Sequence, residues 1–289
     1  IRLVSDEAVI DGETGRILIE KQVIFDLNGH TLTIGAGLGN TVALNVRANG
    51  DLTLKDSSEN QTGTIDATEA DKDVNEGTVP VGTMQAGAKL TVLSGTIIVD
   101  TDSESCVFGM AGTEISIEGG TFINLADTPY VHGGGTPLTV NIDKNASDAS
   151  AILQVTGGTF IGRNPALGDD SVKTGNFIPD TVKLTLTYNE QGEAVYTVLD
   201  ADAEVPEGTP AVYSVESGAV VATVYTAKGL EEALAEGYAT VYLGADITAN
   251  ISVPAGRTLT LDLAGHTLTS NVENVATIYN EGDLTITSS

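Results

Sequence analysis

Hydrophobic and polar residues alternate along most of the chain in short stretches that end at a glycine. In RTLTLDLAGHTLT, residues 257–269, Leu259, Leu261 and Leu263 alternate with threonine and aspartate up to Gly265. A period of two is typical of a β-strand with one buried face, and the Thr, Val and Ile that dominate these stretches favour strands. The pattern therefore predicts many short strands separated by tight turns.

One short pattern occurs three times: apolar, polar, apolar, two spacers, Gly-Thr, and two apolar residues. It reads LTVLSGTII at 90–98, ISIEGGTFI at 115–123 and LQVTGGTFI at 153–161. A degraded copy begins at Leu52 and reaches Gly-Thr-Ile at 63–65. Such short spacings are typical of solenoid repeats, in which equivalent residues stack on one another. We therefore predict parallel strands with one interior column made of Val92, Ile117 and Val155.

A longer repeat relates the two ends of the chain. DLNGHTLT at 26–33 returns as DLAGHTLT at 262–269, and GDLTL at 50–54 returns as GDLTI at 282–286. The pattern of the first six residues, IRLVSD, also returns in VYLGAD. The chain thus holds one repeat of about 240 residues and the opening of a second. We expect the parent protein to continue beyond both ends, or copies to associate head-to-tail through unpaired strand edges.

One amphipathic helix is predicted at residues 227–237, AKGLEEALAEG. Leu230, Ala233 and Leu234 form an apolar stripe, and Gly237 is a natural stop. We expect Leu230 and Leu234 to be buried, with the helix covering the open end of the second copy. Ahead of the helix, residues 181–225 predict β-hairpins around the turns NEQGE and ESG.

DLNGHTLT, the GGTF corners and the LEEALA helix before VYLGADIT together resemble the pectate-lyase-like, right-handed parallel β-helix repeats of large bacterial cell-surface proteins, which include adhesins. The resemblance covers residues 1–178 and 227–289. It implies a β-helix fold and a secreted or cell-surface location. Because this superfamily also includes polysaccharide lyases, glycosidases and phage tailspikes, the fold does not name a function.

We therefore predict an all-β fold: a right-handed parallel β-helix, or solenoid, at residues 1–178. A β-hairpin connector follows at 179–226. Residues 227–289 are expected to hold the capping helix and the start of a second β-helix repeat.

Charge narrows the classes of partner. The formal net charge is −27, and only 13 residues are Lys or Arg. Such a surface repels phosphates and anionic lipids, so nucleic acid is excluded as a partner, and a polyanionic glycan is disfavoured. No apolar run reaches the ~20 residues that span a bilayer, so we expect no membrane insertion. The single cysteine, Cys106, is expected to be a small buried residue rather than a nucleophile.

Candidate binding chemistry lies in the long loops 66–88, 124–137 and 162–177. Lyases of this fold use acidic calcium ligands and an Arg or Lys base, and the arginine considered for such a role is Arg163, in the loop GRNPALGDD with two carboxylates. We assign no catalytic residue. A carbohydrate-binding role is considered for six residues: Tyr130, His132, Arg163, Asn164, Asp169 and Asp170.

A calcium site is considered at Asp71, Asp73 and Asn75, whose spacing resembles an oxygen-ligand loop. The glycine of this segment falls one place late, and no glutamate occupies the twelfth position. A solvated acidic loop is the alternative, and no other cofactor is predicted.

His30 and His266 occupy equivalent places in the long repeat, and each is expected at a corner, hydrogen-bonded to a backbone group.

Thr-x-Thr pairs such as Thr31/Thr33 raise the question of ice binding, which needs threonines in register on successive strands. Loops of unequal length are expected to break that register, leaving ordinary outward threonines.

The sequence thus favours a nonenzymatic surface module, a stalk, adhesin or filament segment whose loops bind glycan or host protein. The alternative is a polysaccharide lyase or glycosidase of the β-helix class.

Overall fold

The fold is that of a computed structural model, which describes residues 1–10, 15–39, 41–70, 78–100, 105–124, 138–142, 152–166 and 177–289. The chain forms two compact units. The first comprises Ile1–Pro179 with Glu193–Val198, and the second comprises Asp180–Gly192 with Leu199–Ser289. The predicted three-part division at residues 179 and 227 stays a prediction.

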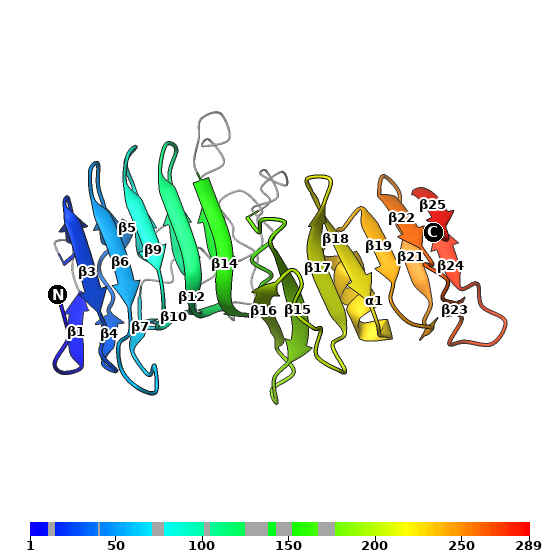
Figure 1. The fold of residues 1–289 in the computed structure, drawn as a ribbon, viewed down its shortest axis with the longest axis horizontal. Helices are drawn as coiled ribbons and strands as arrows, with labels where there is room; N and C mark the ends of the chain where they lie inside the picture. Colours follow the sequence, from blue (N-terminus) through cyan, green and yellow to red (C-terminus); the bar gives the residue numbers. More distant parts are fainter. Residues whose placement is uncertain are drawn as a thin grey trace. The chain divides into compact units, whose positions relative to one another are not determined.

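The first unit contains only strands among its described elements (Figure 1). They are β1 (Glu7–Ile10), β2 (Ile17–Ile19), β3 (Gln22–Asp26), β4 (Thr31–Ile34), β5 (Thr41–Val46), β6 (Asp51–Lys55), β7 (Thr64–Ala67), β8 (Thr78–Thr83), β9 (Lys89–Val92), β10 (Thr96–Val99), β11 (Val107–Gly109), β12 (Glu114–Asn124), β13 (Val140–Ile142), β14 (Ile152–Ile161) and most of β16 (Ala194–Asp200).

The second unit contains further strands and one helix. They are β15 (Val182–Tyr188), β17 (Ala211–Glu216), β18 (Ala219–Val224), α1 (Ala227–Ala235), β19 (Thr240–Leu243), β20 (Ile247–Thr248), β21 (Ile251–Val253), β22 (Thr258–Asp262), β23 (Leu268–Thr269), β24 (Ile278–Asn280) and β25 (Asp283–Thr287). The predicted all-β character of the chain is confirmed at this level.

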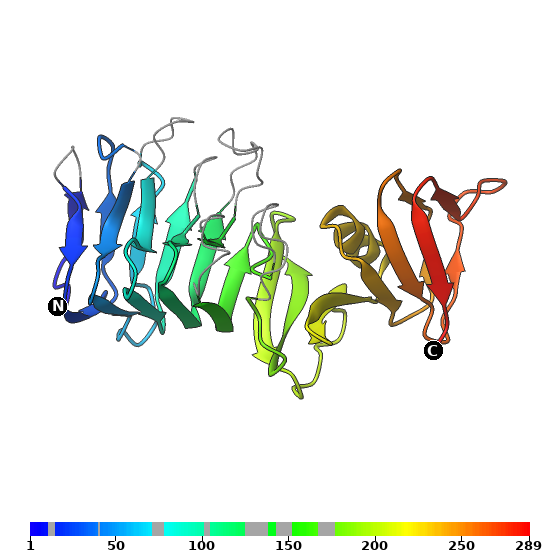
Figure 2. The same ribbon diagram turned by 90° about the horizontal axis from the view of Figure 1, so that it is seen from above.

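Parallel pairing organises the first unit into three rows of strands. The first row runs β3-β6-β9-β12, and the second runs β1-β4-β7-β10-β12-β14. The third is a separate five-stranded parallel sheet in the order β13-β11-β8-β5-β2. Figure 2 shows from above how these strands, from blue to green, follow one another in chain order. None of the sheets closes on itself in the part of the chain that the structure describes.

The register confirms the interior column predicted from the short repeats. Val92 pairs with Ile117, and Ile117 pairs with Val155, and all three side chains are fully buried. A second interior column in the next row contains Phe122 and Phe160, whose rings stack with centroids 4.8 Å apart. Equivalent positions in the sequence repeat are therefore neighbours across the sheet.

Glycine at the corner between the first and second rows explains the repeated Gly-Thr. Gly95, Gly120 and Gly158 have φ values of 98°, 98° and 106°, in the region that disfavours side chains. A Cβ at Gly120 would also stand 2.9 Å from the carbonyl oxygen of Gly95 on the strand before. The corner can therefore be tight only where a glycine occupies it.

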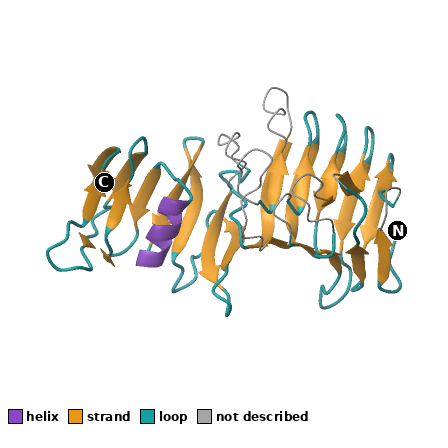
Figure 3. Cartoon of the chain, turned by 180° about the vertical axis from the view of Figure 1, so that it is seen from behind, coloured by secondary structure: helices purple, strands orange, loops and turns teal. Residues whose placement is uncertain are grey.

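In the second unit, β17 and β18 form the predicted antiparallel hairpin, and β18, β19, β22 and β25 then pair in parallel. Figure 3 shows α1 lying against the strands of this unit. The helix begins after the N-cap Thr226, whose hydroxyl accepts the N–H of Gly229 at 3.1 Å. Arg257 donates to the carbonyl oxygens of Leu234 and Tyr238 near the end of α1, so this arginine has a structural role.

The prediction that Leu234 is buried is wrong, whereas Leu230 is fully buried as expected. Gly229, Leu230 and Ala233 form the buried side of the helix, because α1 packs closely on β17 and β18. A Cβ at Gly229 would stand only 2.1 Å from the carbonyl oxygen of Pro210. This close approach turns the helix so that Leu234 is left partly exposed.

Leu230→Ala is therefore expected to lower the free energy of unfolding by about 2–3 kcal/mol through loss of buried area and creation of a cavity. Leu234→Ala should lower it by clearly less, because that side chain already contacts water. Urea unfolding followed by far-UV circular dichroism measures both variants. Equal losses for the two leucines would contradict the observed orientation of the helix.

Candidate functional site

Most residues considered from the sequence for binding lie outside the described residues: Tyr130, His132, Asp169 and Asp170 for carbohydrate, and Asp71, Asp73 and Asn75 for calcium. Arg163 and Asn164 are described and follow β14. Arg163 is partly buried, and Asn164 is buried with its Oδ1 atom accepting the N–H of Ala166 at 2.9 Å. Asn164 thus stabilises its own turn.

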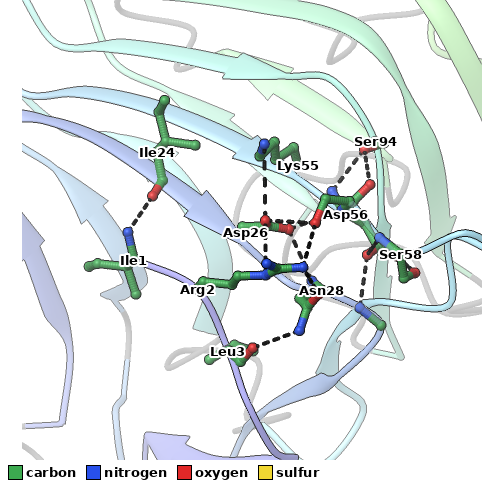
Figure 4. Close-up of polar contacts among 12 residues, drawn as sticks. Ile1, Arg2, Leu3, Ile24, Asp26, Asn28, Lys55, Asp56, Ser58 and Ser94 are labelled. Atoms are coloured by element: carbon green, nitrogen blue, oxygen red, sulfur yellow. Dashed lines mark hydrogen bonds and ion pairs between the residues drawn. The ribbon is translucent and has the colours of Figure 1, made fainter.

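Sequence reasoning missed a polar cluster at the end of β3 and β6, centred on Asp26 (Figure 4). The Asp26 carboxylate accepts the N–H of Asn28 at 3.1 Å, the N–H of Ser57 at 3.0 Å and the Ser57 hydroxyl at 2.8 Å. Two cations flank it, with Arg2 Nε at 3.6 Å and Lys55 Nζ at 4.0 Å from its Oδ2 atom. Burial raises the pKa of Asp26, but the hydrogen bonds from Ser57 and Asn28 outweigh it, so the net shift is downward.

Asp56, next to Lys55 in the chain, is the second carboxylate of the cluster. It accepts the N–H of Gly29 at 2.8 Å, the N–H and hydroxyl of Ser58 at 3.0 Å each, and the N–H of Gly63 at 2.5 Å. Its own N–H donates to Ser94 Oγ at 2.8 Å. Burial raises the pKa of Asp56, but the hydrogen bonds lower it further, and the pKa lies below its usual value.

This cluster superficially resembles a lyase site, because it places carboxylates beside an arginine and a lysine. The oxygens of Asp26 and Asp56 are, however, used by backbone N–H groups and serine hydroxyls of the turns that follow β3 and β6. A carboxylate whose acceptor sites are filled in this way holds turns together, and it offers little to a metal ion or a substrate proton. In the described part of the chain, no three His, Cys, Asp or Glu side chains gather as a metal site.

The second copy of the long repeat keeps the carboxylate and loses the cations. Asp262 accepts the N–H of Ala264 at 2.8 Å and that of Ser289 at 3.0 Å, as Asp26 does in the first copy. The hydrogen bonds from Ser289 and Ala264 lower the pKa of Asp262. Tyr242 and Thr287 stand where the first copy has its arginine and lysine. Since only the carboxylate is common, its turn-stabilising role is the shared feature.

The repeated histidines contact carboxylates, so the expectation of a backbone partner for their rings is wrong. Asp6 Oδ1 lies 3.2 Å from His30 Nδ1 and also accepts the N–H of Thr31 at 2.9 Å. His266 Nδ1 lies 3.7 Å from Asp246 Oδ1, which again accepts the following N–H, at 2.8 Å. The two copies thus agree in an aspartate that joins one strand to the corner of the next.

Cys106 is fully buried, as the sequence predicted. Burial raises the pKa of its thiol to about 12, and the Sγ atom lies 3.3 Å from the carbonyl oxygen of Ile123. A thiol in this environment stays protonated near neutral pH, and protonated thiols are poor nucleophiles.

The aspartates of the cluster could have been found in the sequence from one signal. Each follows a strand and precedes a turn, in DLNG and DSS, where Asp favours hydrogen bonds to its own backbone. The contribution of Arg2 had no such signal, because it comes from a distant segment.

Comparison of the chain with protein-family models, with curated proteins and with solved structures finds no match. Within the described residues, no helix has both the length and the apolar character needed to cross a membrane.

Proposed function

We propose that this chain is a nonenzymatic repeat module of a bacterial surface protein, built as a right-handed parallel β-helix that serves as a stalk, adhesin or filament segment. The resemblance of its repeats to those of large surface proteins motivates the location. Head-to-tail association of copies into a rod belongs to the same proposal.

The observation that carries the proposal is the order in which strands join the three rows. β3, β4 and β5 each enter a different row, and β6, β7 and β8 then pair in parallel with them. β9, β10 and β11 follow in the same way. A chain that coils with three strands per turn produces this succession, and the repeat-like growth suits an extended scaffold.

The cation–carboxylate cluster supports the nonenzymatic role. Asp26 and Asp56 are engaged in hydrogen bonds that hold successive turns, and the second copy lacks the flanking cations. A catalytic set would leave a carboxylate or a base available to substrate.

The full chain is expected to yield no unsaturated or reducing-end products from pectate, xylan or host glycosaminoglycans. Absorbance at the wavelength of the unsaturated product and a reducing-sugar assay measure this. Activity abolished by Arg163→Ala or Asp169→Ala would overturn the proposal in favour of the lyase or glycosidase alternative.

Location and assembly are tested separately. Brief protease treatment of intact source cells should remove the protein if it lies at the surface, and retention inside intact cells would contradict that location. Light scattering over a concentration series should show mass that grows with concentration if copies associate head-to-tail.

A further inference from the structure

The second row of strands carries an unbroken column of threonines on its outward face. Their neighbours in sequence, such as Leu32 and Phe122, point inward and are buried, and the threonines themselves are partly exposed. Each threonine pairs in register with the next: Thr31, Thr64, Thr96, Thr121 and Thr159, with Thr197 across the antiparallel pair of β14 and β16.

The expected absence of a ladder of Thr-x-Thr pairs thus agrees with the pairing, but loops of unequal length do not break the register of the single threonines. The extra residues lie elsewhere along the chain, and the Gly-Thr corners before Thr64, Thr96, Thr121 and Thr159 bring these threonines into register. The threonines that align come from different strands, and Thr33, the partner of Thr31 in the Thr-x-Thr pair, faces Asp66 on the next strand.

A second outward column runs beside the first, two residues further along each strand. It contains Ile98, Ile123 and Ile161 in register, all partly exposed. The face thus consists of one line of hydroxyl groups and, from β10 to β14, one line of aliphatic groups, about 7 Å apart. Both lines cross the strands with a step of about 4.8 Å, so the threonine line from β4 to β14 is roughly 19 Å long.

The hydroxyl groups in the middle of this line are available to a ligand. The Thr64 hydroxyl donates to the carbonyl oxygen of Thr62 at 3.2 Å, whereas those of Thr96, Thr121 and Thr159 make no hydrogen bond to another residue that the structure describes. The backbone pairing of the strands fixes their spacing, so a ligand would meet an ordered row without an entropic cost of arranging it.

We infer that this face binds a neutral, extended polysaccharide chain that lies across the strands. A chain of β-linked pyranose rings presents hydroxyl groups along its edges and C–H groups on its ring faces, which matches a hydroxyl line beside an aliphatic line. A planar lattice such as ice would require hydroxyls in both lines, and isoleucines occupy the second. The inference rests on the proposed nonenzymatic function, since the bound chain is held without being cleaved.

Charge restricts the ligand to neutral glycans. From β4 to β14, the threonine line has no charged residue. Over the same strands, the neighbouring line has one charged residue, Asp66 on β7. With a net charge of −27 on the whole chain, uronate or sulfated polymers would be repelled.

The test is affinity gel electrophoresis of the full chain in gels that contain xyloglucan or galactomannan, with polygalacturonate as the charged comparison. Both neutral polymers are expected to retard the wild type, and polygalacturonate is not. Thr96→Val with Thr121→Val removes two hydroxyls from the line, keeps β-branched side chains, and should weaken retardation about tenfold in dissociation constant. Thr53→Val with Thr91→Val, an in-register pair on the first row, is the matched control and should change nothing.

A third variant distinguishes a linear polymer from a lattice. Ile98→Thr with Ile123→Thr should also weaken retardation, because it removes the aliphatic line. Inhibition of ice recrystallisation by the wild type that this variant strengthens would instead overturn the inference.

The remaining outcomes separate this inference from the proposed function. No retardation in either neutral polymer, or equal loss in the control pair, overturns the glycan-binding face and leaves the nonenzymatic scaffold standing. Retardation accompanied by shortening of the polymer contradicts the scaffold proposal and the noncleaving face together. Retardation of an uncleaved polymer that only the second-row variants weaken supports both.

Discussion

Phe122→Ala is expected to lower the free energy of unfolding of the first unit by about 3–5 kcal/mol. The Phe122 ring is fully buried and stacks on Phe160, and Ile97 is its partner on the other neighbouring strand. Because backbone pairing holds the strands on both sides at a fixed spacing, the neighbours cannot collapse into the space that the ring leaves. Urea unfolding is followed by far-UV circular dichroism, since the chain has no tryptophan.

Phe108→Ala on β11 is the matched control, because this ring is partly exposed. Its loss should be clearly smaller than that of Phe122→Ala. A loss below about 1 kcal/mol at Phe122 would contradict the packed column, since truncation of a buried aromatic residue in rigid surroundings lowers the free energy of unfolding by more than this.

Asp56→Ala is expected to destabilise the first unit by about 3 kcal/mol. It deprives the N–H groups of Gly29, Ser58 and Gly63 of their acceptor at a buried corner, and buried donors without partners are unfavourable. Asp51→Ala, at the start of the preceding strand β6, is the control. That side chain accepts a hydrogen bond only from Gln22 among the described residues, so its loss should stay within about 0.5 kcal/mol.

The pH dependence of stability gives a second readout of the same carboxylate. Folding lowers the pKa of Asp56, so its contribution is fully present above the unfolded-state pKa of about 3.9 and is lost as the pH falls through the folded-state pKa. The difference in free energy of unfolding between wild type and Asp56→Ala should therefore become smaller as the pH drops below about 4. A gap that stays constant down to pH 2, at about the lower limit of such shifts, would assign the loss to packing instead.

The repeats explain why so much of the core could be predicted. Alternation of apolar and polar residues assigns each side chain to a face, and copies that share one pattern must occupy equivalent levels. Val92, Ile117 and Val155 could therefore be placed in one column before any fold was known, and the structure confirms that column.

The candidate sites were less accessible to such reasoning. The motif-based choices in the long loops depend on how irregular segments fold, and periodicity gives no information there. The Asp26 and Asp56 cluster brings together Arg2, near the start of the chain, and Ser57 and Gly63, from the loop after β6. Local spacing cannot show that these groups meet.

The helix forms where the sequence predicted it, but the predicted burial of Leu234 was wrong. Its apolar stripe placed Leu230 and Leu234 on one side, and helical periodicity alone cannot choose between their exposures. The close approach of Gly229 to the Pro210 carbonyl makes that choice, because it fixes which side of the helix faces the sheet.

By itself the sequence determined the β-strand character, the interior columns and the equivalence of the two copies, since all three follow from periodicity along one dimension. The alignment of outward residues across strands, and the hydrogen bonds that donors distant in sequence make to Asp26 and Asp56, depend on how the strands pair. The threonines at 31, 64, 96, 121 and 159 are irregularly spaced in the chain and evenly spaced in the sheet. Hydrogen-bonded strand pairing sets the spacing of these threonines in the sheet. The lengths of the loops set only their spacing in the sequence.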